Sequence, residues 1–256
     1  MCIRDSKRIM QLAAENVTRV TLELGGSDPM IVCDDADIRR ATAAAAIGRF
    51  FNAGQACLAV KRVDVFKQVA DEFMTKIADR AAKEWKVGNG LAEGTKMGPL
   101  HTEAQRAEVE AQVADAVGRG AKVLAGAKRP EGKDFEKGWF MEATVLSDVP
   151  EDSRMATEEV FGPAMPIFIV DDLDEAITKA NGSVYGLGSS IWTRDLAKAR
   201  RAAEQIEAGY TWVNDIQVAY DQLPFGGAKQ SGFGKEHGLE ALEGYLEKKS
   251  IVLATG

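Results

Sequence analysis

Nearly continuous apolar runs alternate along this chain with longer segments that have helical spacing. The runs at 29–33 and 164–170 are typical of strands buried on both faces, and the segments at 69–85 and 102–119 have the periodicity of amphipathic helices. Further strands are expected at 20–24, 60–66, 123–125, 143–146, 188–193 and 210–214, and further helices at 7–16, 38–51, 173–180 and 196–207. This alternation predicts an α/β fold in which helices cover a mostly parallel sheet.

Two polar stretches interrupt the pattern. Asp34, Asp35 and Asp37 surround the start of the helix expected at 38–51. Carboxylates favour that end of the helix dipole, and their spacing matches no calcium loop, so N-capping is favoured over a cation site. The charged segment 129–137 contains Pro130 and is expected to be an exposed loop.

Composition and charge exclude several classes of protein. The chain has 256 residues, 45% of them hydrophobic, and 32 basic against 39 acidic residues give a net charge of −7. An acidic chain without a basic stripe is not expected to bind nucleic acid. No apolar run approaches the roughly 20 residues of a membrane span, and the N-terminus has no secretory h-region. The sequence therefore predicts a cytoplasmic protein that does not enter a membrane.

The cysteines and histidines are few and scattered. Cys2, Cys33 and Cys57 form no disulfide framework, which suits a reducing compartment. His101 and His237 are far apart and have no patterned partner, so neither a metal site nor a histidine-based triad is expected.

Cys57 is the candidate nucleophile. A lone cysteine is usually a small buried hydrophobic residue, and Cys33, at the end of an apolar run, is expected to be one. The preceding stretch 52–56, Asn-Ala-Gly-Gln-Ala, is poor helix and poor strand, so it breaks the helix before it. A thiol that follows such a turn meets backbone N–H groups, which lower its pKa and can stabilise an oxyanion.

Glu23 lies 34 positions before Cys57 and is followed by two glycines after Leu24. A glutamate at a strand end is most often simply solvated, but the glycines allow a sharp turn and close approach to a ligand. A thiol and a carboxylate together can perform covalent catalysis. The thiolate attacks a carbonyl, and the carboxylate deprotonates the water that releases the acyl group.

The runs at 23–26, 50–57, 158–163 and 224–236, in this order, resemble the catalytic half of the aldehyde dehydrogenase superfamily. The resemblance implies oxidation of a small-molecule aldehyde with NAD or NADP, with Cys57 as nucleophile and Glu23 as general base. It also implies cofactor contacts from Glu159, Phe161, Leu24 and Gly25, and a mainly architectural role for 224–236. Ser27 and Asp28 resemble a succinate-semialdehyde dehydrogenase branch.

The family's dinucleotide-binding domain has no counterpart in this sequence. We interpret 1–6 as a foreign start, 7–22 as a remnant of the cofactor domain, 23–227 as the catalytic domain, and 228–256 as a return segment with an oligomerisation strand at 251–253. The parent is expected to form a homodimer or tetramer, and the isolated chain to be inactive as a dehydrogenase. A residual thiol esterase and a non-catalytic pseudo-subunit are the alternatives.

Overall fold

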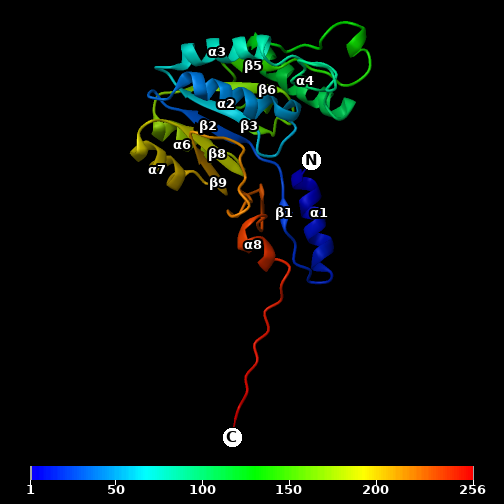
Figure 1. Cartoon of the computed structure of the whole chain (residues 1–256), viewed down its shortest axis with the longest axis vertical. Helices are drawn as coiled ribbons and strands as arrows, with labels where there is room; N and C mark the ends of the chain where they lie inside the picture. The colour runs from blue at the N-terminus through cyan, green and yellow to red at the C-terminus, as the bar shows by residue number, and fades with distance from the viewer. Residues whose placement is uncertain (1, 256) are drawn as a thin grey trace.

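A seven-stranded sheet, ordered β4-β5-β6-β3-β2-β8-β9, forms the centre of the computed structural model, which describes residues 2–255 (Figure 1). All neighbouring strands are parallel except β4, which runs antiparallel to β5. The strands are β2 (Asp28–Val32), β3 (Val60–Phe66), β4 (Lys122–Ala125), β5 (Thr144–Ser147), β6 (Ala164–Val170), β8 (Gly188–Trp192) and β9 (Tyr210–Val213). The prediction of a mostly parallel α/β sheet is confirmed.

Helices cover both faces of the sheet. Met30 and Val32 of β2 pack against α2 (Ile38–Phe50) and α3 (Ala70–Lys83). Ile31 and the adjoining Cys33 point to the opposite face and pack against α6 (Leu173–Asn181) and α7 (Leu196–Gln205). α4 (Glu103–Gly118) and the short α5 (Arg154–Thr157) help to enclose a third cluster over β5 and β6. Cys33 is fully buried, as predicted.

The acidic cluster before α2 has two functions. Asp37 is the N-cap, because its side chain accepts a hydrogen bond of 3.0 Å from the backbone N–H of Arg40. Asp35 instead accepts a 2.7 Å hydrogen bond from the Thr193 hydroxyl, and Asp34 pairs with a lysine of α7. The capping prediction is therefore correct for Asp37, whereas Asp35 ties the end of β2 to the connection after β8 and Asp34 ties it to α7.

Small elements lie outside the sheet. β1 (Leu22–Glu23) pairs antiparallel with β11 (Gly232–Phe233), and β7 (Tyr185–Gly186) pairs with β10 (Ala228–Lys229). α1 (Cys2–Ala14) runs beside β1, and α8 (Gly238–Glu243) precedes the C-terminal tail (Figure 1). The strand expected at 20–24 is thus only two residues long. Met1, part of the expected foreign start, lies outside the described residues.

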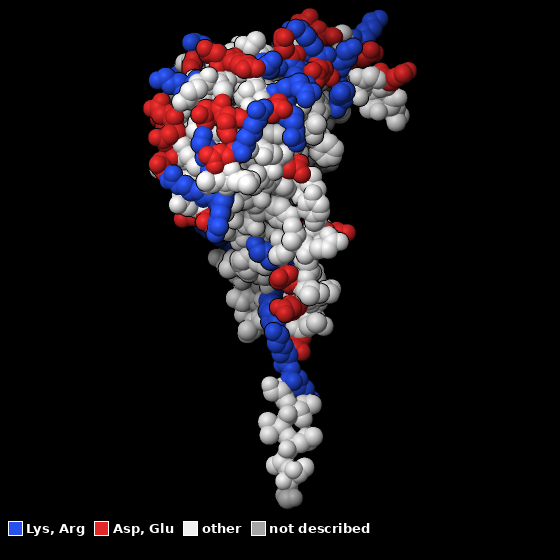
Figure 2. All heavy atoms as spheres, turned by 60° about the vertical axis from the view of Figure 1, so that its left-hand side comes forward, with Lys and Arg blue, Asp and Glu red and all other residues white. Residues whose placement is uncertain are grey.

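Residues 251–255 have no regular secondary structure in the single chain, so the oligomerisation strand at 251–253 stays a prediction. Ile251, Val252 and Leu253 are 72%, 91% and 85% exposed, and no neighbouring strand offers them backbone partners. Figure 2 shows this end as an uncharged projection, whereas acidic and basic side chains are interspersed over the helical layers. Within residues 2–255, no helix has both the length and the hydropathy needed to cross a bilayer.

Candidate active site

A tight turn presents Cys57 between α2 and β3. After α2 the chain forms the 3-10 segment η1 (Phe51–Gly54), and three successive residues have left-handed φ: Asn52 at 51°, Ala53 at 55° and Gly54 at 72°. Asparagine and glycine tolerate this conformation, whereas alanine adopts it at a cost. The predicted break of the helix is therefore present, and it leaves the Cys57 side chain half-buried before β3.

Arg49, in the last turn of α2, anchors this turn from inside the protein. Its fully buried guanidinium donates hydrogen bonds to the carbonyl oxygens of Gly54, at 2.8 Å, and Val160, at 3.0 Å. A side chain at Gly54 would collide with the Gly162 carbonyl, because its Cβ would lie 2.2 Å from that oxygen. The Cys57 turn and the segment 158–163 are thus fastened together, although they lie more than a hundred residues apart.

The electrostatic surroundings of Cys57 differ from the expectation. Burial raises the pKa of its thiol, and the Lys61 ammonium and the Leu58 N–H oppose this without reversing it. The nearby carboxylates of Asp28 and Glu23 also raise the pKa. The expected lowering of the thiol pKa is therefore wrong for this conformation, because loss of hydration outweighs the backbone and lysine contributions.

Glu23 occupies the end of β1, opposite Gly232 of β11. Its pKa is raised to about 7, first by burial and then by the Glu236 carboxylate, while the Gly227 N–H and the Lys235 ammonium oppose the rise. A carboxylate with this pKa can take a proton from water near neutrality. Segment 224–236 was expected mainly to lead the chain back from the catalytic domain. Its Lys235 and Glu236 also place one charge of each sign near Glu23 and help to line an open groove of about 450 Å³ beside it.

Glu159 lies against the glycine turn that follows Glu23. Its Oε1 accepts a 3.3 Å hydrogen bond from the Gly26 N–H, and a Cβ at Gly25 would lie 1.9 Å from its Oε2. Only glycine at position 25 leaves room for this carboxylate. Phe161 is half-buried two residues further on. The backbone of Leu24 extends the pairing of β1 with β11, because its N–H donates to the Ser231 carbonyl at 3.2 Å.

A buried group of charges behind these residues was missed in the sequence. Lys61 is fully buried, and its ammonium donates to the Cys57 carbonyl at 2.8 Å and forms an ion pair with Glu159. Asp28 is also buried, and its Oδ1 accepts a 3.1 Å hydrogen bond from the Gly188 N–H. The sequence does contain a signal for this group of charges, because Lys61 lies inside the strand 60–66. The other positions of that strand are apolar, except for Arg62 and Asp64, which form an ion pair with each other.

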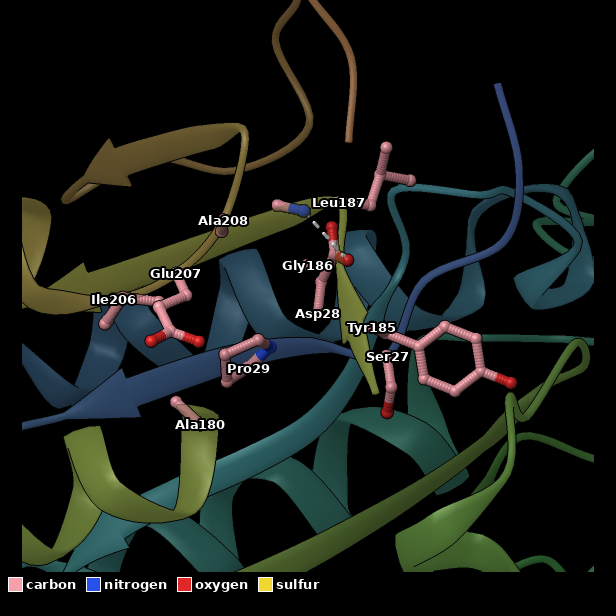
Figure 3. Close-up of a pocket in the computed structure, with 11 residues that line it drawn as sticks. Ser27, Asp28, Pro29, Ala180, Tyr185, Gly186, Leu187, Ile206, Glu207 and Ala208 are labelled. Atoms are coloured by element: carbon pink, nitrogen blue, oxygen red, sulfur yellow. Dashed lines mark hydrogen bonds between the residues drawn. The ribbon is translucent and has the colours of Figure 1, made fainter. Parts of the chain in front are cut away.

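Asp28 lines a small cavity of about 10 Å³, which Figure 3 shows between β2 and the segment around Gly186. Its pKa is raised to about 7 because burial removes the hydration of its charged form, and the Lys61 ammonium and the Gly188 N–H limit the rise. The cavity is close to the smallest volume that can hold one water molecule, so it is too small for a substrate. The chemistry of the site lies around Cys57, Glu23 and Glu159 instead.

Comparison with known proteins gives one family. The family model described as "Aldehyde dehydrogenase family" matches residues 4–251. Betaine aldehyde dehydrogenases from Brucella anthropi and Bacillus subtilis are 40% and 41% identical to this chain over 98% and 97% of its length. A point mutant of betaine aldehyde dehydrogenase from Staphylococcus aureus, solved in complex with NAD+, superposes with a TM-score of 0.93 at 41% identity over 96% of this chain. The chain spans about half the length of these relatives, namely 51% of each sequence and 50% of the solved chain. Their names do not support the succinate-semialdehyde interpretation.

Proposed function

Because this chain belongs to the aldehyde dehydrogenase family, we propose that it carries the catalytic residues of an enzyme that oxidises an aldehyde to a carboxylic acid with NAD+. One observation carries the proposal. Cys57, Glu23 and Glu159 converge on the glycine turn at 25–26, where a Cβ at Gly26 would lie 3.3 Å from the Cys57 carbonyl oxygen and one at Gly25 would strike Glu159. A nucleophile, a base and a candidate cofactor contact thus share one small region.

The residues present fit the nicotinamide end of the cofactor. The Glu159 side chain is 15% exposed, and it lies beside a turn that has no side chains of its own. In this proposal Glu159 holds ribose hydroxyls, Phe161 packs nearby, and Leu24 and Gly25 supply the adjacent backbone. When bound, NAD+ accepts the hydride that leaves the aldehyde carbon.

The chain's own residues perform the remaining steps. The Cys57 thiolate forms a carbon–sulfur bond with the aldehyde, and the Cys57 N–H stabilises the resulting oxyanion. Departure of the hydride converts this adduct into a thioester. Glu23 then takes a proton from water, the hydroxide attacks the thioester, and the carbon–sulfur bond breaks to release the acid and restore the thiol.

The substrate we propose is an aldehyde that carries a quaternary ammonium group, like the substrate in the relatives' name. Cys57 packs against a cluster that contains Tyr210, Trp212 and Phe225, with ring centroids of Tyr210 and Trp212 4.7 Å apart. Aromatic rings attract quaternary ammonium groups through their π faces. Succinate semialdehyde, which carries a carboxylate of the opposite charge, is the matched comparison.

The proposal is tested by the covalent chemistry at Cys57. An activated ester such as 4-nitrophenyl acetate should acetylate Cys57 in this chain. Betaine aldehyde with NAD+ should give NADH that depends on Cys57 in a protein that also has the dinucleotide-binding domain, whereas this chain alone is expected to give none. Peptide mass spectrometry locates the acetyl group, and Cys57→Ala is the control. Acetylation that survives in Cys57→Ala, or that maps to other residues, would contradict the assignment. Ester turnover without NADH formation in the protein that has both domains would favour the thiol esterase, for which Cys57 and Glu23 suffice.

A further inference from the structure

The ammonium group of Lys61 lies where three segments of the candidate active site meet. Lys61 is the second residue of β3, and its side chain is fully buried. It donates a 2.8 Å hydrogen bond to the carbonyl of Cys57 and pairs with the Glu159 carboxylate, which in turn accepts the Gly26 N–H. One cation thus links the nucleophile's own backbone to the glycine turn after Glu23.

The charges around Lys61 are arranged to keep this cation in place. Burial lowers the pKa of Lys61 and the neighbouring Arg49 adds to this, whereas the carboxylates of Glu159 and Asp28 oppose the lowering and favour the charged form. The ring of Phe161 lies 5.5 Å from its ammonium nitrogen, within the range of a cation–π contact. These partners restrict the position of the Lys61 ammonium. Because the ammonium donates to the Cys57 carbonyl, they also restrict the orientation of that carbonyl.

We propose that Lys61 is a positioning residue of the nucleophile: held by its ion pair with Glu159, it orients the Cys57 backbone and stabilises the thiolate from within the protein. Glu159 therefore has a second role besides the one implied for the cofactor. The relation to aldehyde oxidation rests on the proposed function, whereas the contacts themselves do not. The charged or titratable groups that face the Cys57 thiol are Lys61, Asp28 and Glu23.

The rate of Cys57 alkylation by iodoacetamide, measured across pH in the full chain and located by peptide mass spectrometry, tests this proposal. Lys61→Met removes the cation, so alkylation at pH 8 should slow about tenfold, whereas Lys61→Arg should retain most of the rate. Asp28→Asn keeps the shape and an acceptor for the Gly188 N–H but removes a negative charge, so alkylation should accelerate about threefold. Lys67→Met is the matched control, because Lys67 follows the same strand and its side chain is 75% exposed.

The opposite signs separate a specific role from general damage. Loosening of the site would move Lys61→Met and Asp28→Asn in the same direction, and that result would overturn the proposal. An unchanged rate in a folded Lys61→Met protein would overturn it as well. If Lys61→Met does not fold, Lys61→Gln, which keeps a hydrogen-bond donor but removes the charge, decides instead: slower alkylation supports the proposal, and an unchanged or faster rate refutes it. Acetylation of Cys57 by the activated ester, measured separately, reports on the proposed function.

Discussion

At the scale of single residues, the pKa of the candidate base Glu23 is set by its surroundings. Glu23 would be fully ionised at neutral pH in water, but burial and Glu236 raise its pKa to about 7. Half of the molecules then carry a neutral Glu23 at that pH, and the ionised fraction grows as pH rises. The residue is therefore most useful as a base just above neutrality.

Glu23→Gln should separate acylation from hydrolysis. Glutamine cannot accept the proton of the attacking water, so release of an acetyl group from Cys57 should slow about a hundredfold or more, with acetylation itself retained. Time-resolved intact mass spectrometry measures both steps. In the unaltered chain, deacylation should rise with pH to half its plateau near pH 7, and a flat profile would contradict the role of Glu23.

Gly25 should not accept a side chain. Gly25→Ala would place a methyl group on the Glu159 carboxylate and should cost about 1–3 kcal/mol in the free energy of unfolding. Urea unfolding measures this loss. Gly90→Ala is the matched control, since no atom lies within 4 Å of the Cβ it would add. Equal stability of the two variants would show that Glu159 moves aside at little cost.

The residues of the site were only partly predictable. Cys57, Glu23, Gly25 and Glu159 belong to short runs of recognisable composition, and the structure places them together. Lys61, by contrast, stands in a strand beside Arg62, where a charge is normally read as facing solvent. Only the three-dimensional pairing with Glu159 shows that its charge is buried, and that pairing spans 98 positions.

At the scale of elements, the order of strands and helices followed from periodicity, because two-sided burial leaves a continuous apolar run. The strands 60–66 and 164–170 have the predicted bounds. Prediction failed for the short pairs β1–β11 and β7–β10, whose residues pair through long-range contacts that no local pattern encodes. The oligomerisation strand at 251–253 stays a prediction, because a strand of that kind needs a partner strand for its backbone groups.

The turn that carries Cys57 should depend on Arg49 more than on any propensity of its own sequence. Arg49→Ala leaves two buried carbonyls without their donor and opens a cavity, so it should cost about 3 kcal/mol of stability. Chemical denaturation measures this loss. Arg40→Ala, on the exposed side of the same helix, should change the stability by less than about 0.5 kcal/mol. Similar values for both variants would mean that the turn holds its shape unaided.

At the scale of the whole molecule, two raised carboxyl pKa values should make stability fall as pH rises. Asp28 and Glu23 have ordinary pKa values of 3.8 and 4.5, and both are raised to about 7 in the folded chain. Between the ordinary and the raised pKa values the folded state binds more protons than the unfolded state. The contribution of these two carboxyl groups to the free energy of unfolding is therefore complete below about pH 4 and lost as pH rises through about 7. Asp28→Asn should flatten the decline in urea unfolding measured from pH 5 to pH 8. An equally steep decline in the variant would contradict the assignment to Asp28.

The ends of the chain should promote association. Ile9, Met10 and Leu12 of α1 are 46%, 45% and 51% exposed, and Tyr245 and Val252 in the tail are 88% and 91% exposed. Apolar surface of this extent favours contact with other chains, so sedimentation should show a mass that increases with concentration. Deletion of 245–256 should weaken this association and leave a single cooperative unfolding transition, since the described part of the tail projects away from the sheet (Figure 1). A loss of cooperativity would contradict the independence of the core.

Descendants of this chain are expected to inherit Lys61 together with its two carboxylates. A mutation that removes the lysine alone leaves Arg49 as the remaining buried cation near the carboxylates of Asp28 and Glu159. A mutation that removes a carboxylate alone leaves Lys61 with fewer partners. Loss of the lysine alone thus passes through a less stable protein. Replacement of Lys61 by an uncharged residue should accordingly be found alongside an uncharged residue at position 28.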